Sequence, residues 1–329
     1  MSLYENEIQA FFKVETTEGT DAIPTATDVI KVSNITFKPL NVETVEGRFI
    51  RSWAGRFPRI VTRTSVTFSV EVDMCGYGAL GATPTPIAGL DAMIRCCGMS
   101  MAYAMATGYT YSLIAPQAAP SGTLYYFQDG TRHVVTGCRG TWRATGAVNQ
   151  LGKVNFEFTG VADPSFFTDA ANLSGVSFAN WPDPLAINGV NTTGFVLHGL
   201  TLGTTANFRV RAFEVGLGNA YALKNNIGDG RGRVLATDRD VTGRATLEWE
   251  RLASLSRNLI ADAANALYTG ANAGFSLTHG VAGNQWFISC PTTQLDNPDF
   301  SREEGLVYFQ TEFGAIPTAA NNELQLIIR

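Results

Sequence analysis

The sequence predicts a mainly β protein of the α+β class, with two tandem sandwich or barrel domains that each carry one packed helix. Three observations lead to this prediction: period-two alternation of apolar and polar residues, one helical segment in each half, and a module that occurs twice in the 329-residue chain. Period-two alternation leaves one face buried and the other wetter, as in antiparallel sheets. A helix between strands in each half favours a sheet-based core with a helix on one side.

The internal repeat is seen when Gly130 is placed over Gly283 and both stretches are read forward, at a constant offset of 283 − 130 = 153 residues. The further coincidences are Gly152 with Gly305, Val154 with Val307, Phe156 with Phe309, Ala162 with Ala315, Pro164 with Pro317 and, upstream, Val66–Glu71 with Ala245–Glu250. Self-similarity at this length predicts a duplicated β domain rather than a solenoid. We therefore expect an N-terminal domain with an arm at residues 1–165 and its duplicate at 166–329.

The first half begins with a stretch rich in Thr and Glu, residues 5–28, which we interpret as a polar N-terminal arm. Clean alternation then runs along residues 65–73 and again along 153–159, where apolar Val and Phe alternate with Ser, Thr, Asn, Lys, Glu and Asp. Between them, residues 86–97 have a helical pattern, and Gly98 follows as a left-handed cap. These segments predict two half-buried strands with one helix between them.

The second half follows the same order, with a helix expected over roughly residues 254–268. Each half also has a long hairpin after its first strands, at 39–57 and at 214–232, and hairpins of this length usually project from the body. Residues 163–184 are the candidate linker between the domains. Residues 323–329 predict a final strand.

The composition favours a surface that is covered by other copies of the chain. Charged residues make up 16% of the sequence, glycine accounts for 33 residues, and the mean hydropathy is +0.03. An isolated soluble domain usually has about 25% charged residues. A β-rich enzyme with a large core is the alternative that composition leaves open.

Charge and hydropathy exclude several other classes. The net charge is −5 and there is no Lys/Arg cluster interleaved with aromatic residues, which disfavours binding of nucleic acid to a basic surface. No apolar run approaches the ~18 residues of a membrane span, and the first residues lack the pattern of a secretory signal. Five cysteines without metal-site spacing are interpreted as reduced and structural, in a cytosolic folding compartment.

Residues that could carry catalysis do not form a recognisable motif. His133, His198 and His279 are dispersed, and no GxSxG nucleophile motif occurs. The Gly-rich stretch 228–232 lacks the Lys-Ser/Thr ending of a P-loop, so a hairpin tip is the better interpretation. We therefore predict a protein that is not an enzyme and has no catalytic, cofactor-binding or metal-binding residues. A carbohydrate-binding or hydrolytic β protein stays open as an alternative.

Several motifs resemble one known family. They are Glu15-Thr16-Thr17-Glu18-Gly19-Thr20-Asp21-Ala22-Ile23-Pro24-Thr25, the helix end Arg95-Cys96-Cys97-Gly98, and Tyr125-Tyr126-Phe127-Gln128-Asp129-Gly130 followed by His133, Gly137 and Gly140-Thr141. With these motifs the chain resembles tail tube proteins of bacteriophages with long, non-contractile tails. The resemblance is best over residues 11–164 and continues more weakly to the end. The stretch 137–140 is close to the family pattern without being identical to it.

The resemblance implies a self-assembling structural subunit of the virion tail, assembled in the host cytoplasm. In that family, rings stack into a hollow conduit for DNA, and two-domain subunits can form trimeric rings with pseudo-sixfold symmetry. The implied partners are other copies of the chain, a tape-measure protein, and tail terminator or distal tail proteins. DNA would pass through without specific binding. The alternative is another β-rich tail part, such as a terminator, baseplate or decoration protein.

Two sets of residues are candidates for roles in such a tube. Residues on the two hairpins are expected to contact the next ring: Glu43, Glu46, Arg48, Arg51, Trp53, Asn225, Asn226 and Asp229. Residues on the polar faces of predicted strands are expected to face the lumen: Ser69, Glu71, Asn155, Glu157, Glu248 and Gln310. A neutral to acidic lumen would repel the DNA backbone.

Overall fold

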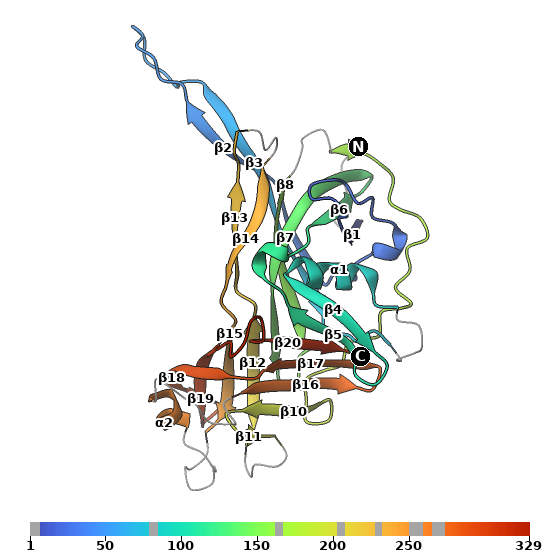
Figure 1. Ribbon diagram of the computed structural model, residues 1–329, viewed down its shortest axis with the longest axis vertical. Coiled ribbons are helices and arrows are strands. Elements are labelled where there is room, and N and C mark those ends of the chain that lie inside the picture. The colour runs from blue at the N-terminus through green and yellow to red at the C-terminus, as the bar shows by residue number, and fades with distance from the viewer. Residues whose placement is uncertain are drawn as a thin grey trace.

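A computed structural model describes most of the chain (Figure 1). The described residues are 7–78, 85–161, 167–202, 208–227, 232–249, 259–264 and 274–329. Before residue 165 the elements are β1 (Ile8–Val14), η1 (Ala26–Asp28), β2 (Asn34–Glu46), β3 (Arg59–Asp73), α1 (Ala88–Cys96), β4 (Met99–Ala104), β5 (Gly108–Leu113), η2 (Pro116–Ala118), β6 (Gly122–Gln128), β7 (Thr131–Ala147) and β8 (Lys153–Val161).

The elements after residue 165 are again mainly strands. They are β9 (Thr168–Asp169), β10 (Thr192–Leu197), β11 (Leu200–Thr201), β12 (Val210–Gly216), β13 (Asn219–Lys224), β14 (Arg233–Arg239), β15 (Thr242–Glu248), α2 (Leu259–Ala264), β16 (Phe275–Val281), β17 (Asn284–Cys290), β18 (Thr293–Glu303), β19 (Leu306–Ala315) and β20 (Gln325–Ile328). The predicted mainly β fold class is confirmed. Among the described residues, no helix is long and apolar enough to cross a membrane.

The larger sheet is a continuous antiparallel path of eight strands in the order β18-β19-β15-β12-β7-β8-β3-β2. The start of β7 extends this sheet through β6 to β1, and also pairs with β9. The alternation that predicts the strands at 65–73 and 153–159 determines their orientation: Val66, Val70 and Phe156 are fully buried, while the intervening polar residues point to the opposite face.

The second sheet has the order β11-β10-β16-β17-β20-β5-β4, so both large sheets contain strands from both sides of residue 165. Strand β20 confirms the predicted final strand and joins the two parts, since it pairs with β17 on one side and β5 on the other. One apolar core cluster extends through both halves and includes the fully buried Trp142, Tyr111, Phe195 and Phe309. Burial of such large aromatic side chains is a dominant source of stabilisation.

The two halves use their first-sheet strands in the same order. The path β2-β3-β8-β7 in the first half has its counterpart in β12-β15-β19-β18, and each half places a helix after its second strand. Gly130 and Gly283 occupy equivalent turns, β6–β7 and β16–β17, with φ of +79° and +81°. Gly152 and Gly305 are required for different reasons. Gly305 has a left-handed backbone conformation, whereas Gly152 leaves space for Met74, whose Sδ atom would lie 2.7 Å from an added Cβ atom.

The N-terminal arm is where the structure departs from the sequence prediction. Within residues 5–28, strand β1 is part of the main body, where it pairs with β6 along its whole length. Phe12 packs into the main core, and Phe11 packs into a second small cluster on the opposite face with Tyr125 and Phe127. Because both faces of β1 are covered, its sequence lacks the polar alternation of a half-exposed strand.

The predicted helices have different outcomes. Helix α1 matches the helix expected at 86–97, and it ends before Gly98, which has φ of +83°. In the second half the structure describes α2, which lies inside the predicted segment 254–268. The flanking parts of that segment lie outside the described residues.

Candidate assembly surfaces

The eight-strand path has one face on the core and one polar face. All six residues predicted to face the lumen lie on this polar face, because cross-strand neighbours in antiparallel pairs share a face. The pairings are Ser69 with Glu157, Glu71 with Asn155, and Thr246 with Gln310; Glu248 lies two residues beyond Thr246 on β15. The structure thus brings together candidates that are up to 241 residues apart in sequence (310 − 69).

Three basic side chains on the polar face are paired with carboxylates. Lys153 Nζ lies 2.5 Å from Glu71 Oε1, Arg143 Nη1 lies 2.8 Å from Glu214 Oε1, and Arg209 Nη1 lies 3.2 Å from Glu248 Oε1. The hydrogen bond from Lys153 to Glu71 raises the pKa of the Lys153 ammonium group, against the opposing effect of desolvation. Such pairing prevents these bases from forming a continuous positive surface toward a polyanion.

The two halves are joined within this sheet by one antiparallel ladder. Strands β7 and β12 pair from Arg143 opposite Gly216 to Ala147 opposite Ala212. The path ends in β2 on one side and β18 on the other, and each of these has one partner strand among the described residues. Unpaired strand edges are templates for pairing with another chain. Strand β2 occupies the place in the first half that β12 occupies in the second.

The first hairpin, β2–β3, projects far from the body (Figure 1). Ion pairs hold its stem together, with Glu43 bound to Arg63 and Glu46 at 3.3 Å from both Arg48 and Arg59. The hydrogen bond from Arg48, and then that from Arg59, lowers the pKa of the Glu46 carboxyl group. Glu43, Glu46 and Arg48, predicted to contact the next ring, therefore also have partners inside the hairpin.

The tip of this hairpin, residues 47–58, is organised around Arg51. Its guanidinium carbon lies 4.2 Å from the ring centre of Phe57 and 5.9 Å from those of Phe49 and Trp53. Cation–π contacts of this kind are worth about 0.5–1 kcal/mol at exposed sites. Ile50 is fully exposed and Trp53 is 65% exposed, so the tip presents apolar surface to its surroundings.

The second hairpin, β13–β14, does not project freely over its described part but packs on the first half of the same chain. Asn219 Nδ2 donates to the Cys97 carbonyl at 2.7 Å and to that of Gly140 at 3.1 Å. Farther along, Asn225 Nδ2 donates to the Thr62 carbonyl on β3 at 3.3 Å. Asn226 is exposed, and Asp229 lies outside the described residues. Over its described residues this hairpin therefore lies against the first half instead of projecting, because polar side chains bind it to neighbouring strands.

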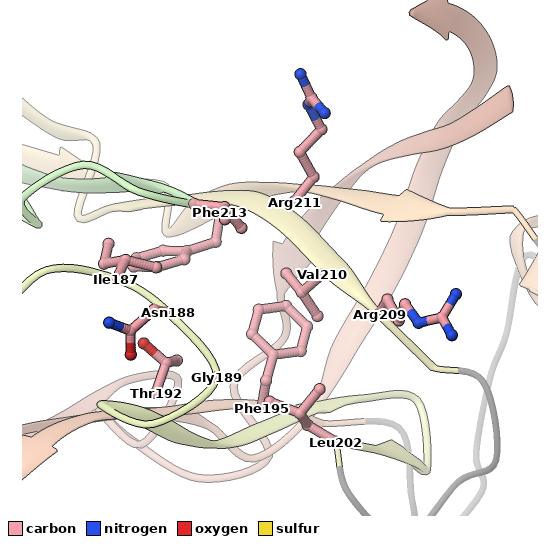
Figure 2. A pocket seen from close by; sticks show the side chains of 11 residues that line it. Ile187, Asn188, Gly189, Thr192, Phe195, Leu202, Arg209, Val210, Arg211 and Phe213 are labelled. Carbon is pink, nitrogen blue, oxygen red and sulfur yellow. The ribbon is translucent and has the colours of Figure 1, made fainter. Parts of the chain in front are cut away.

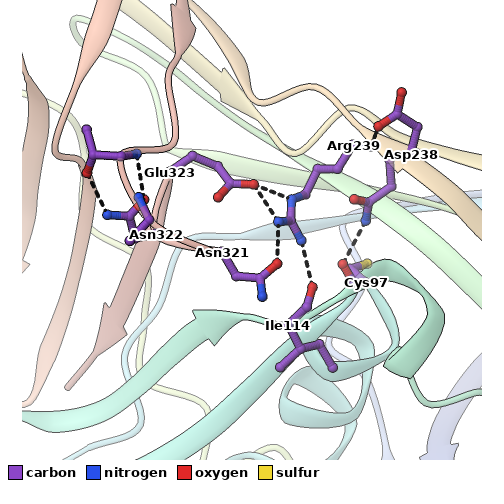
Figure 3. Close-up of polar contacts among 10 residues, drawn as sticks. Cys97, Ile114, Asp238, Arg239, Asn321, Asn322 and Glu323 are labelled. Atoms are coloured by element: carbon purple, nitrogen blue, oxygen red, sulfur yellow. Dashed lines mark hydrogen bonds and ion pairs between the residues drawn. The ribbon is translucent and has the colours of Figure 1, made fainter.

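Arg239, at the end of β14, anchors the base of the second hairpin (Figure 3). Its Nε atom donates to Glu323 Oε1 at 2.7 Å, its Nη1 to the Ile114 carbonyl at 2.8 Å, and its Nη2 to Asn321 Oδ1 at 3.1 Å. Arg239 and Glu323 are both nearly buried, with side-chain exposures of 7% and 10%. The contacts tie the hairpin to the segment after β5 and to the loop before β20. No sequence motif predicted these contacts of Arg239.

An apolar cavity of about 210 Å³ lies between β10 and β12 (Figure 2). Its walls are formed mainly by aliphatic and aromatic side chains, namely Val148, Ile187, Phe195, Leu202, Val210 and Phe213. Arg209 and Arg211 also line it, and in Figure 2 their guanidinium groups point away from the apolar centre. Two ion pairs occupy Arg211, with Glu303 at 2.6 Å and Glu304 at 3.9 Å.

The segment 15–25 is mostly exposed, but its first residue, Glu15, is the centre of a buried set of polar contacts. Glu15 accepts hydrogen bonds from the Gly19 and Gly137 N–H groups, both at 2.7 Å, and from the hydroxyls of Ser121 at 2.6 Å and Thr123 at 2.9 Å. Buried carboxylates require such donors. Glu18 and Asp21, from the same segment, bind Arg139 and Tyr125 at 2.8 and 2.6 Å. The motif residues therefore hold the loop onto β6 and β7.

The fold and these surfaces are those of a structural subunit with open sheet edges, a polar sheet face and a projecting hairpin. A family model described as phage tail tube protein matches residues 5–315, nearly the whole chain, and the chain belongs to this family. It is therefore a structural component of the phage tail, and not an enzyme. No curated protein matches the sequence.

Proposed function

We propose that three copies of this chain close into a ring with pseudo-sixfold symmetry, and that such rings stack into the tail tube through which DNA passes. Each chain would contribute its two halves as two adjacent places around the ring. The residue ranges 1–165 and 166–329 are then two tail-tube domains of common origin. The corresponding strand orders of the two halves and the equivalent turns at Gly130 and Gly283 support this division.

The observation that carries the proposal is the ladder between β7 and β12 inside one chain. It joins the last strand of one half to the first strand of the next. Strands β18 and β2 are the corresponding last and first strands, and each has a single partner strand in the described part of the chain. Antiparallel pairing of β18 in one copy with β2 in the next repeats the internal junction between copies. Repetition around a ring pairs both ends of the eight-strand path, so that this path has no edge left.

Closure in this way turns the eight-strand path of three chains into one barrel with the core on its outside. Its polar face, with Ser69, Glu71, Asn155, Glu157, Glu248 and Gln310, would line the lumen. The carboxylates on this face and the pairing of its bases favour passage of DNA without binding. Further contacts with a tape-measure protein and with terminator or distal tail proteins follow from the family resemblance.

Ring closure can be tested by native mass spectrometry and hydrogen exchange on isolated subunits and assembled rings. We expect rings of three chains, and amide protection of β2 and β18 that appears only on assembly. Strands β7 and β12 provide the internal control, since their ladder exists in the subunit and should be protected in both states. Rings with six whole chains, or unchanged exchange in β2 and β18, would refute the proposal.

A further inference from the structure

We propose that the apolar cavity between β10 and β12 receives the tip of the β2–β3 hairpin from a copy in the adjacent ring. The inference rests on the proposed stacking of rings and identifies the two surfaces that would be in contact between adjacent rings. The occupant is a second copy of this chain, with Ile50 and Trp53 as the inserting side chains. The cavity walls are Val148, Ile187, Phe195, Leu202, Val210 and Phe213.

The tip and the cavity lie at opposite rims of the same sheet. Strand β2 runs toward the tip, and each neighbouring strand along the path is antiparallel to the one before it. Strand β12 therefore runs in the same direction as β2, so that Val210 at its start lies at the rim opposite the tip. Figure 1 agrees, with the hairpin at one end of the longest axis and β10–β12 at the other. Ring stacking brings opposite rims into contact.

The tip has the properties of a preformed insert. Arg51 is bound by the carbonyls of Gly55 and Arg56 and lies against the surrounding aromatic rings, so the tip has an internal structure before it meets a partner. Ile50 and Trp53 remain exposed outside this arrangement. An ordered tip loses less conformational entropy on binding than a flexible one. Exposed apolar groups gathered in one place indicate an interaction site.

The cavity has the size and lining for such an insert. Its volume of about 210 Å³ exceeds the roughly 150 Å³ with which an apolar cavity can bind benzene, so one large apolar side chain fits. Val148 at its edge is 41% exposed. A Cβ atom added to Gly189, another lining residue, would have no neighbour within 4 Å, so the space beside it is open.

Charge complementarity favours the same pairing. The tip, residues 47–58, contains Arg48, Arg51 and Arg56 and no carboxylate. Beside the cavity, Glu248, Glu303 and Glu304 are paired with the lining residues Arg209 and Arg211, three carboxylates against two bases. Glu303 and Glu304, in the β18–β19 turn, keep side-chain exposures of 55% and 75%. A basic tip entering beside two adjacent glutamates gains attraction and correct orientation. The pair of surfaces is heterologous, with each copy offering its tip on one rim and its cavity on the other. Contacts of this kind generate open filaments.

The first experiment disrupts the cavity and the hairpin tip in separate variants. Ring formation is followed by native mass spectrometry, and tube formation by negative-stain electron microscopy. Gly189→Trp should fill the cavity, and Trp53→Ala with Ile50→Asp should remove the insert. We expect intact rings and at least a tenfold loss of mean tube length for both. Gly189→Ala and Met105→Ala are the matched controls; Met105 is 65% exposed, like Trp53, but lies in the β4–β5 turn. Both should form normal tubes.

The second experiment detects the contact directly with Ile50→Cys and Val148→Cys, because the five natural cysteines are all buried. Mild oxidation of mixed tubes should give disulfide-linked pairs that contain one copy of each variant, while either variant alone should give none. Normal tubes from Gly189→Trp, or absence of the mixed pair, would overturn the tip-in-cavity contact while leaving the ring proposal intact. If the unaltered chain forms no rings at all, the proposed function itself fails.

Discussion

Glu15 and Asp91 illustrate two ways in which a single buried carboxyl group is accommodated. Glu15 is surrounded by four donors from three separate segments, and it acts as an acceptor for all of them. Asp91 on α1 accepts a hydrogen bond from the Tyr111 hydroxyl at 2.8 Å and lies 3.6 Å from the Arg95 guanidinium. The first group connects a loop to the sheet, and the second connects the helix to β5.

Replacement of Glu15 by Gln should destabilise the isolated subunit. Each carboxylate oxygen accepts from one backbone N–H group and one hydroxyl. An amide NH2 group in place of one oxygen would leave that N–H without its acceptor and force the hydroxyl to turn, and the remaining hydrogen bonds would no longer be to a charged group. The expected loss is about 2–4 kcal/mol in the free energy of unfolding, measured by urea denaturation. Glu7→Gln is the control, because Glu7 is exposed and should change little. A Glu15→Gln subunit as stable as the control would contradict the assigned role.

Asp91 should make stability depend on pH. Burial raises the pKa of the Asp91 carboxyl group above its usual 3.8, against the opposing effects of Tyr111 and Arg95. The folded chain therefore retains this proton to higher pH than the unfolded chain, and the resulting stabilisation is lost as pH rises through the folded-state pKa.

The Asp91→Asn subunit lacks this titration and tests the sign of the effect. The unfolding free energy of the natural chain, minus that of the variant, should fall as pH is raised upward from about 3.8. Denaturation series at successive pH values measure this difference. A difference that stays flat or rises would show that burial does not dominate at Asp91.

At the level of elements, the two long hairpins occupy corresponding positions in the chain but lie differently in the structure. Strand β2 continues into its hairpin as one strand of 13 residues, with two register shifts in its pairing with β3. Strand β12 instead ends at Gly216, and the chain turns at Gly218, where φ is +58° and a Cβ atom would lie 2.1 Å from the Asp240 carbonyl oxygen. Glycine is required for this close approach. The turn directs β13–β14 onto the first half, where Asn219 secures it.

Asn219→Ala should loosen the second hairpin. It removes the donor to two carbonyls, of Cys97 and Gly140, and should cost about 1–3 kcal/mol. Hydrogen exchange in β13 and β14 should become faster, while exchange in β16 and β17 stays unchanged. Asn226→Ala, at the exposed end of the same hairpin, is the control and should leave exchange at the base of the hairpin as it was.

The elements differ in how well the sequence could predict them. Strands β3 and β8 were predictable because each has one buried and one polar face. Strand β1 was not, since Phe11 and Phe12 are consecutive and pack into separate clusters. The candidate lumen residues follow directly from alternation. The β7–β12 ladder, the Arg239 contacts and the cavity depend on how distant segments meet, which no local pattern encodes.

At the level of the whole molecule, the polar face of the continuous sheet contains charged residues from both halves of the chain. A row of polar residues crosses seven strands and the internal junction: Asp73, Lys153, Thr145, Glu214, Arg244, Glu312 and Asp296. If this face lines a lumen, the row forms part of a continuous band around it. The four acids of this row outnumber its two bases, which keeps the local potential from becoming positive.

Reversal of charge on this face should convert a passive lumen into one that holds DNA. In tubes that carry Glu157→Lys, Glu248→Lys and Glu312→Lys, we expect short DNA to be retained, with an affinity that falls steeply as salt rises. Glu7→Lys, Asp169→Lys and Asp183→Lys together make the same change in net charge away from this face. Equal DNA retention by both sets, measured with labelled duplexes, would rule out the polar face as the lumen wall.

The packing of β13–β14 against the first half has a consequence for the rotation of successive rings relative to each other. In a ring of three chains, the β2–β3 hairpins would be the hairpins that project toward the next ring among the described residues, and they would stand 120° apart. Two rings could then stack at three relative rotations instead of six. A rotation by 60° would place each hairpin over the wrong half of a subunit. The divergence of the two halves would in this way fix the rotation of each new ring relative to the ring below it. A subunit with two identical halves could not distinguish rotations that differ by 60°.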